Sequence, residues 1–174
     1  GHSAPNNYSR EIPLAPSDHP VLTRDPVSAR GMSKADIAGL RRWHRNAAIR
    51  GMKAGFDIVY VYAGHNLGIP QHFLSRRYNQ RTDEYGGSLE NRARLLRELI
   101  EDTKDAVGHR CAIAVRLAVD ELIGPDGLTS DGEGREGVEM LAELPDLWDV
   151  NVSEWDNDSP TSRFSPEGAQ EPFI

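Results

Sequence analysis

Residues 60–65 read Tyr60-Val-Tyr-Ala-Gly-His65, and this short segment joins an apolar run to two side chains that can exchange protons. The run 57–62 has the length and the β-branched and aromatic composition of a strand. A long polar loop and a helical pattern follow it. An α/β barrel builds its reactive site in this order, from side chains at the carboxyl ends of its strands. Tyr62 and His65 are therefore candidate site residues.

Helical spacing of apolar residues and short β-rich runs predict alternating helices and strands. Ser33 and Asp36 form a capping-box pattern before the first helix, Ser130 and Glu133 form another before the third, and Ser88 can cap the second. Strands that alternate with helices imply right-handed βαβ units and a parallel sheet. The helices are expected over 34–54, 89–107 and 131–143, and the strands over 57–62, 112–117 and 147–153.

The N-terminal part of the chain differs from the rest. Residues 1–32 carry prolines without a clear period, so we expect a loop excursion there and βα units over 33–174. Three strands cannot close a barrel that needs eight strands and about 250 residues. The chain also begins with Gly1 rather than Met. We therefore expect 1–174 to be a fragment of a single barrel domain that leaves strand edges unpaired.

Composition argues against several classes of function. The net charge of −7 disfavours a nucleic-acid partner, which requires a basic face. No run of 18 or more apolar residues exists, so no membrane span is expected, and no signal peptide is visible, which favours a cytoplasmic location. The single cysteine, Cys111, cannot form an internal disulfide, and the histidines do not share a metal-ligand spacing. We expect no metal site in this segment.

Polar side chains stand at or just after the end of each predicted strand. Tyr62 and His65 follow the first, Arg116 ends the second, and Trp155 and Asp158 follow the third. Each has a structural alternative: a core tyrosine, a satisfied loop histidine, a salt-bridged arginine, a packing tryptophan and a turn aspartate. Because the carboxyl ends of parallel strands meet at one edge of a sheet, we expect the five to cluster there.

The loop between the first strand and the second helix is dense in polar groups of fixed geometry. Arg81, Asp83 and Tyr85 are expected to hold this loop by hydrogen bonds and ion pairs rather than to touch a substrate. The pair Gly86-Gly87 indicates a tight turn. The loop is therefore interpreted as structural.

The segment Asn79-x-Arg-Thr-Asp-x-Tyr-Gly-Gly-Ser-Leu-Glu-Asn-Arg92 resembles the loop and helix after the fourth strand of the old yellow enzyme family of FMN-dependent barrel oxidoreductases. The resemblance implies a partial TIM (β/α)8 barrel, with the predicted strands as strands four to six, and FMN as cofactor. Ene-reductases of this family usually place His, and Asn or His three residues later, where this chain has Tyr62 and His65. That combination resembles the branch of trimethylamine, dimethylamine and histamine dehydrogenases.

The resemblance also implies roles. Tyr62, His65 and Asp158 would be catalytic, Arg116 would contact the flavin, and Trp155 with Tyr62 would bind the substrate. The implied reaction is hydride transfer from the carbon next to nitrogen of a small or N-methylated amine to the flavin. It implies a homo-oligomeric parent with an unknown electron acceptor, in which an iron–sulfur cluster and a second nucleotide would lie outside this segment. The alternatives are an ene-reductase or 2,4-dienoyl-CoA reductase-like enzyme, and a non-catalytic barrel fragment.

Overall fold

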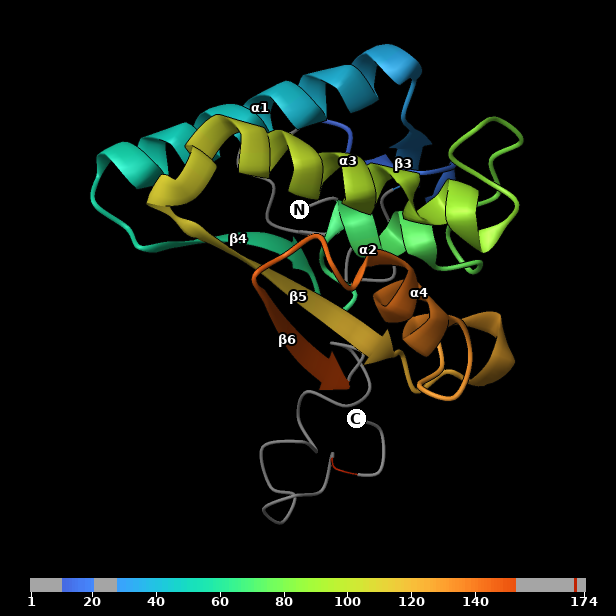
Figure 1. Ribbon diagram of the computed structural model, residues 1–174. Helices are drawn as coiled ribbons and strands as arrows, with labels where there is room; N and C mark the ends of the chain where they lie inside the picture. The colour runs from blue at the N-terminus through green and yellow to red at the C-terminus, as the bar shows by residue number, and fades with distance from the viewer. Residues whose placement is uncertain (1–10, 21–27, 153–170, 172–174) are drawn as a thin grey trace.

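A computed structural model describes residues 11–20, 28–152 and 171, and the structural statements below concern these residues. Its centre is a sheet of β4 (Ile58–Ala63), β5 (Ala112–Asp120) and β6 (Leu147–Val152), which pair in that order and run parallel. Helices α1 (Lys34–Lys53) and α3 (Leu89–Val107) lie together over one face of this sheet (Figure 1). The predicted α/β class with a parallel sheet is confirmed.

Both long helices begin where the sequence predicts. The Ser33 hydroxyl accepts a hydrogen bond from the Asp36 N–H at 3.1 Å, and the Asp36 carboxylate accepts one from the Ser33 N–H at 2.8 Å. This reciprocal pair satisfies two amides that a helix N-terminus leaves without partners. Ser88 caps α3 through the Asn91 N–H at 3.3 Å, and Gly108 ends that helix with a φ of +56°.

Helix α4 (Glu133–Leu141) begins differently from the prediction. Its N-cap is Gly132, which has no side chain to offer, so the expected capping box at Ser130 is wrong. The Glu133 carboxylate instead accepts a hydrogen bond from Arg92 at 2.6 Å and pairs with Arg76. Arg92 is 1% exposed, and a buried guanidinium requires an anionic partner. Pairing with the buried Arg92 therefore stabilises Glu133 more than the expected hydrogen bond to the backbone at Ser130 would.

The prediction also missed several short elements. Helix α2 (Ile69–Leu74) and the turns η1 (Gly108–Arg110) and η2 (Gly124–Asp126) are too short to produce a periodic apolar pattern. The segment expected to be a loop contains three strands, with β3 pairing parallel to β1 and antiparallel to β2. The loop expectation is therefore corrected over the described part of 11–32. These strands are β1 (Leu14–Ala15), β2 (His19–Pro20) and β3 (Ser28–Gly31).

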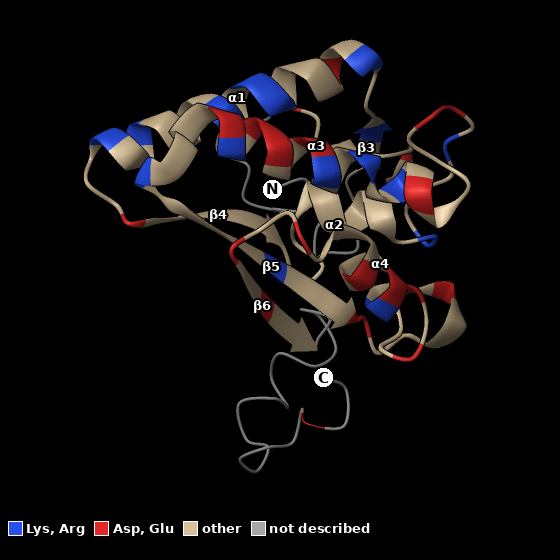
Figure 2. Cartoon of the chain, in the orientation of Figure 1, with Lys and Arg blue, Asp and Glu red and all other residues tan. Residues whose placement is uncertain are grey.

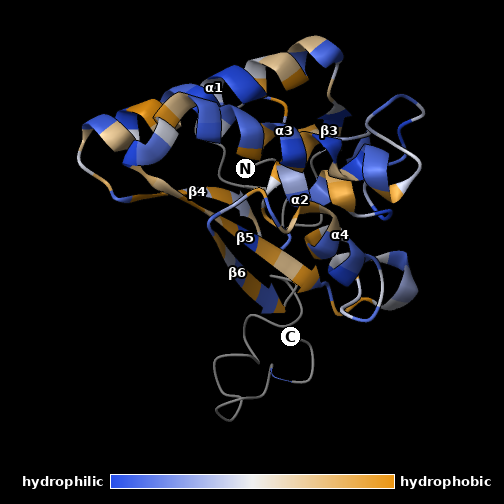
Figure 3. Ribbon diagram, viewed as in Figure 1, coloured by the Kyte–Doolittle hydropathy of each residue, from blue (hydrophilic) through white to orange (hydrophobic). Residues whose placement is uncertain are grey.

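The core lies between the sheet and the two long helices. In β4, Val59, Val61 and Ala63 are buried in it, whereas Ile58, Tyr60 and Tyr62 on the opposite face are 39–47% exposed. Figure 3 shows the apolar strands next to helices that are hydrophilic on much of their surface. Each fully buried leucine of α3 contributes roughly 1.5–3 kcal/mol to this packing. The alternation along β4 leaves one sheet face available for other groups.

Charged side chains are concentrated on the helices, whereas the strands carry few (Figure 2). Arg41 of α1 contacts Asp102 of α3 at 2.7 Å and Glu98 at 3.1 Å, and Arg45 contacts Asp105 at 2.8 Å. These ion pairs join α1 to α3 on the face of the sheet that both helices cover. No helix in the described part of the chain is long and apolar enough to cross a membrane.

The loop before α3 is held as the sequence analysis expects. The Arg81 guanidinium donates to the backbone oxygens of Met32 at 2.5 Å and Pro16 at 2.9 Å, and it pairs with Asp83 at 2.5 Å. The Tyr85 hydroxyl donates to Glu98 at 2.9 Å. The loop is thus fastened both to the N-terminal strands and to α3.

Candidate functional site

Three polar side chains form a row across the central sheet. Tyr62 of β4 is the register partner of Arg116 of β5, which is the register partner of Asp149 of β6. Register partners project from the same face of a sheet, and here it is the face opposite the helices. The Arg116 guanidinium donates to the Asp149 carboxylate at 3.2 Å. The row therefore places a phenol, a cation and an anion side by side.

His65 joins this row through Tyr62. The Tyr62 hydroxyl and His65 Nδ1 are 2.7 Å apart, and the two rings are nearly parallel, at 18° with centroids 6.2 Å apart. Burial raises the pKa of Tyr62, whereas burial and the nearby Arg116 lower the pKa of His65. At neutral pH both groups are uncharged, and which of them donates in this hydrogen bond depends on the ring nitrogen that carries the hydrogen of His65.

His65 stands in a turn that side chains seldom adopt. The Leu67 N–H donates to the Gly64 oxygen at 3.1 Å, and the two central residues, His65 and Asn66, both have a φ of +55°. Positive φ at both central positions is the pattern of a type I′ turn, which favours Asn-Gly or Gly-Gly. A left-handed conformation costs a residue with a side chain about 1–2 kcal/mol. Surrounding contacts must therefore hold this turn.

Asn66 receives those contacts from α2 and the loop after it. Its N–H donates to the Gln71 side-chain oxygen at 2.8 Å, its backbone oxygen accepts from His72 Nε2 at 3.0 Å, and its amide donates to the Tyr78 hydroxyl at 2.6 Å. The His72 ring stacks on Tyr78 with centroids 4.1 Å apart. The turn that presents His65 is thus fixed at three points.

The burial of His72 predicts an acid-sensitive stability. Burial lowers its pKa from 6.5 to about 3, so the unfolded chain binds a proton below pH 6.5 that the folded chain does not. The free energy of unfolding of the full-length protein is expected to be constant with respect to this group above pH 6.5. Below it, we expect a fall of about 1.4 kcal/mol per pH unit. Denaturant titrations from pH 4 to 8 measure this slope.

A pair of histidine variants isolates that contribution. His72→Gln should reduce the slope between pH 4 and 6.5 by about 1.4 kcal/mol per pH unit, because His19, His44 and His65, whose pKa values burial also lowers, remain. His109→Gln, at an exposed position, is the matched histidine substitution. An equal slope in the wild type and His72→Gln would contradict the assignment.

The neighbourhood of Arg116 fits a planar group rich in hydrogen-bond acceptors. Arg116 Nε is buried and has no hydrogen-bond partner among the described residues. A Cβ at Gly64 would lie 2.9 Å from Asn151 Oδ1 and 3.3 Å from Arg116 Cγ, so a side chain there would require Asn151 and Arg116 to shift. A buried donor without a partner costs about 1–3 kcal/mol. A flavin, with its ring oxygens and nitrogens, would supply the missing acceptor.

Tyr62, His65 and Arg116 are therefore brought together, with Tyr62 and His65 at the carboxyl end of β4. Arg116 was expected to end its strand, but it lies in the middle of β5, because that strand continues to Asp120 by pairing with β6. Trp155 and Asp158 lie outside the described residues, so their predicted places stay predictions. Sequence reasoning missed Asp149, although its position two residues after Leu147 in a predicted strand was a usable signal. It also missed the three residues that hold Asn66, because neither a helix of six residues, with Gln71 and His72, nor the loop that carries Tyr78 gives a sequence signal of its contacts.

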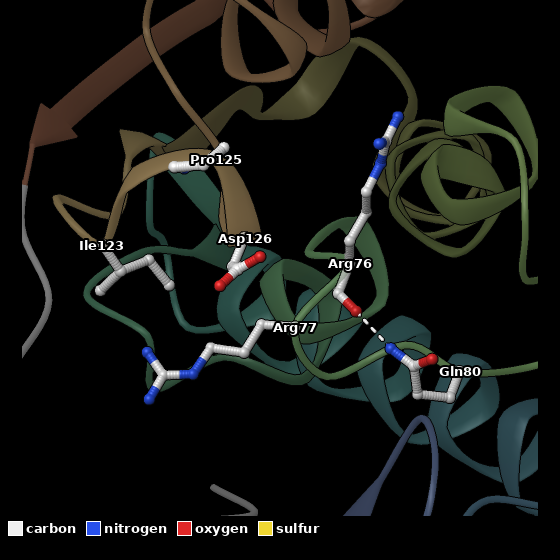
Figure 4. A pocket seen from close by; sticks show the side chains of 6 residues that line it. All are labelled: Arg76, Arg77, Gln80, Ile123, Pro125 and Asp126. Atoms are coloured by element: carbon white, nitrogen blue, oxygen red, sulfur yellow. Dashed lines mark hydrogen bonds between the residues drawn. The ribbon is translucent and has the colours of Figure 1, made fainter.

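A separate pocket of about 670 Å³ lies between the loop after α2 and η2 (Figure 4). The Arg76 guanidinium pairs with Glu133, and in Figure 4 it points away from Asp126 and Arg77. The residues around this pocket include none of the predicted site residues, so we place the candidate site at the sheet. They are Arg76, Arg77, Gln80, Ile123, Pro125 and Asp126.

Comparison with known proteins finds relatives that match over the whole of this chain. Dimethylamine dehydrogenase of Hyphomicrobium sp. (strain x) is 37% identical over 183 residues, covering 100% of this chain and 25% of the relative. Histamine dehydrogenase from Rhizobium sp. 4-9 matches at 55% identity with a TM-score of 0.91, covering 100% of this chain and 25% of that structure. A 6-hydroxypseudooxynicotine amine oxidase from Pseudomonas geniculata N1 matches at 55% identity and 0.92, with 100% and 26% covered.

These similarities confirm the resemblance to the amine dehydrogenases and the assignment to a partial barrel. An old yellow enzyme homologue from Zymomonas mobilis also superposes, with a TM-score of 0.77 at 28% identity over 91% of this chain and 47% of that structure. The chain spans about a quarter of the length of the amine-oxidising relatives. The sequence profile of the NADH:flavin oxidoreductase / NADH oxidase family matches residues 2–172. The chain therefore belongs to this family of flavin oxidoreductases.

Proposed function

We propose that the full-length protein is an FMN-dependent oxidoreductase that oxidises a small amine at the bond between carbon and nitrogen. The observation that carries the proposal is the hydrogen bond of 2.7 Å between Tyr62 and His65, beside Arg116 on the free face of the sheet. The dimethylamine dehydrogenase and histamine dehydrogenase that this chain resembles are named for amine substrates. The arrangement supports an amine rather than a carbonyl compound.

The protonation states of Tyr62 and His65 suit an amine substrate. An amine in water is largely protonated at pH 7, and it gives up hydride readily only when its nitrogen lone pair is free. Tyr62 and a neutral His65 together can accept that proton: with the Tyr62 hydroxyl donating to Nδ1, the tyrosine oxygen would take the amine proton as its own proton passes to Nδ1. Trp155 would hold the substrate cation by cation–π attraction of about 0.5–2 kcal/mol. Asp158 would orient His65 from the other side.

Arg116 would hold the cofactor. FMN, when bound, would supply the hydride acceptor. The Arg116 guanidinium carries a positive charge at any working pH, and its Nε has no partner among the described residues. A fixed cation at this place stabilises negative charge as it develops. Asp149 keeps the guanidinium in position through the contact at 3.2 Å.

The test is anaerobic mixing of purified full-length protein with candidate reductants while the absorbance of oxidised flavin is followed. We expect dimethylamine, histamine or a related secondary or primary amine to bleach the flavin band within seconds, and NAD(P)H to do so slowly. Rapid bleaching by NAD(P)H with re-oxidation by an activated alkene would instead identify an ene-reductase. Protein without a flavin spectrum would support a non-catalytic role.

The pH dependence of turnover gives a sharper prediction. Because burial and Arg116 lower the pKa of His65 below its ordinary 6.5, the basic form persists to lower pH. In the pH profile of kcat/KM, the limb assigned to His65 should therefore have its midpoint below pH 6.5, with activity lost as pH falls through that midpoint. A second limb, from the substrate amine, should lie far above it.

His65→Gln serves as the matched variant. It should turn over slowly and lack the acidic limb while keeping the alkaline one. An acidic midpoint above 6.5 in the wild type, or the same limb in His65→Gln, would refute the assignment of the base.

A further inference from the structure

We propose that Gln71 is a positioning residue for His65, acting through the backbone of Asn66. This inference rests on the proposed function, in which His65 is the base. Gln71 is 0% exposed and lies on α2, next to the end of β4 (Figure 1). Among the described residues its side chain hydrogen-bonds Asn66 and Glu121, and neither Tyr62 nor Arg116. Its effect on the site must therefore pass through the turn.

The side-chain amide of Gln71 is held at both ends. Its oxygen accepts the Asn66 N–H at 2.8 Å, and its nitrogen donates to Glu121 Oε1 at 3.3 Å. The other oxygen of Glu121 accepts from the Ser75 hydroxyl at 2.7 Å and the Leu128 N–H at 2.8 Å. Since Glu121 can only accept when ionised, it fixes which end of the Gln71 amide faces Asn66.

The turn gives this contact its importance. His65 and Asn66 both stand at a φ of +55°, a conformation that L-residues adopt only when their surroundings impose it. Loss of the acceptor for the partly buried Asn66 N–H would favour a different backbone path. Any relaxation at Asn66 rotates the neighbouring His65 and lengthens its bond to Tyr62, which is 2.7 Å here. Gln71 thus sets the geometry of a base that it does not touch.

The first experiment compares Gln71→Met with Ser75→Ala in the full-length protein. Both remove one buried hydrogen bond to Glu121, but only Gln71→Met releases the Asn66 N–H. A displacement of about 1 Å at a reacting group costs up to about 100-fold in rate. We expect kcat to fall about 10- to 100-fold in Gln71→Met with KM little changed, and to stay within about twofold of the wild type in Ser75→Ala.

The second experiment is a rescue. Glycine adopts positive φ without cost and is the preferred residue at the second central position of a type I′ turn. Asn66→Gly in the Gln71→Met background should therefore restore most of the lost kcat. General damage to the core would not be repaired by this change. A folded double variant as slow as Gln71→Met would overturn the proposal.

Crystal structures of the same full-length variants provide a readout without substrate. The distance from the Tyr62 oxygen to His65 Nδ1 should lengthen in Gln71→Met and return in the double variant, whereas an unchanged distance in Gln71→Met would overturn the proposal. If no amine is oxidised, the proposed function fails and this distance still decides the positioning role. If Gln71→Met does not fold, the comparison is made at position 66 instead. Asn66→Gly should then have a higher kcat than Asn66→Ala, and equal kcat values would overturn the proposal.

Discussion

Replacing Arg116 with methionine in the full-length protein is expected to lower the rate of flavin reduction by an amine about 10²- to 10³-fold. Removing one preorganised donor at a site of developing negative charge has effects of this size. The guanidinium lies in the row with Tyr62 and Asp149, and its Nε has no other partner among the described residues. Anaerobic stopped-flow measurement of the flavin band at saturating amine gives the rate.

Arg116→Lys is the matched control. Lysine keeps the charge but not the planar fork that holds both Asp149 and a second acceptor, so its loss should be smaller than that of methionine. Both variants should melt within a few degrees of the wild type. A methionine variant that retains flavin and reduces it at the wild-type rate would show that Arg116 only serves the ion pair.

Substituting alanine for Gly134 in the full-length protein should be strongly destabilising. A Cβ there would lie 1.8 Å from the Val119 oxygen and 2.8 Å from the Thr129 oxygen. Both are backbone atoms that cannot rotate away, so α4 must move from the end of β5. Overpacking of this kind costs about 3 kcal/mol or more. Urea denaturation of the full-length protein, compared with the wild type, measures the loss.

Gly137 of the same helix provides the control. A Cβ at Gly137 meets no heavy atom of the described residues within 4 Å. Gly137→Ala should therefore stabilise the helix by about 0.5–1 kcal/mol, because alanine loses less backbone entropy on folding. Equal effects of the two substitutions would mean that the contact with Val119 is relieved at little cost.

The sequence predicted element boundaries best where local patterns alone determine them. The ends of α1 and α3 were predicted to within one residue, because caps at Ser33 and Ser88 and long periodic faces specify them. Strand β5 runs three residues beyond the predicted Leu117 to Asp120, since its continuation depends on pairing with β6. Local propensity cannot report a pairing partner.

The same division applies to the site. Tyr62, His65 and Arg116 could be predicted because they are polar groups in or just after apolar strand patterns, and neighbouring parallel strands place such residues together. Gln71 could not, because its role depends on the left-handed turn at 65–66 and on the amide orientation that Glu121 imposes. Glu133 was misread as a cap because the burial of Arg92 is not visible in the sequence.

The attachment of the 79–88 loop has a consequence for how such barrels can be recombined. Arg81 binds the backbone at Pro16 and Met32, and the Gln80 N–H donates to the Ser17 hydroxyl at 2.9 Å. A chimera that grafts this loop from a relative would therefore lose its docking surface unless residues 11–32 are exchanged with it. Two stretches separated by α1, β4 and α2 behave as one transferable module.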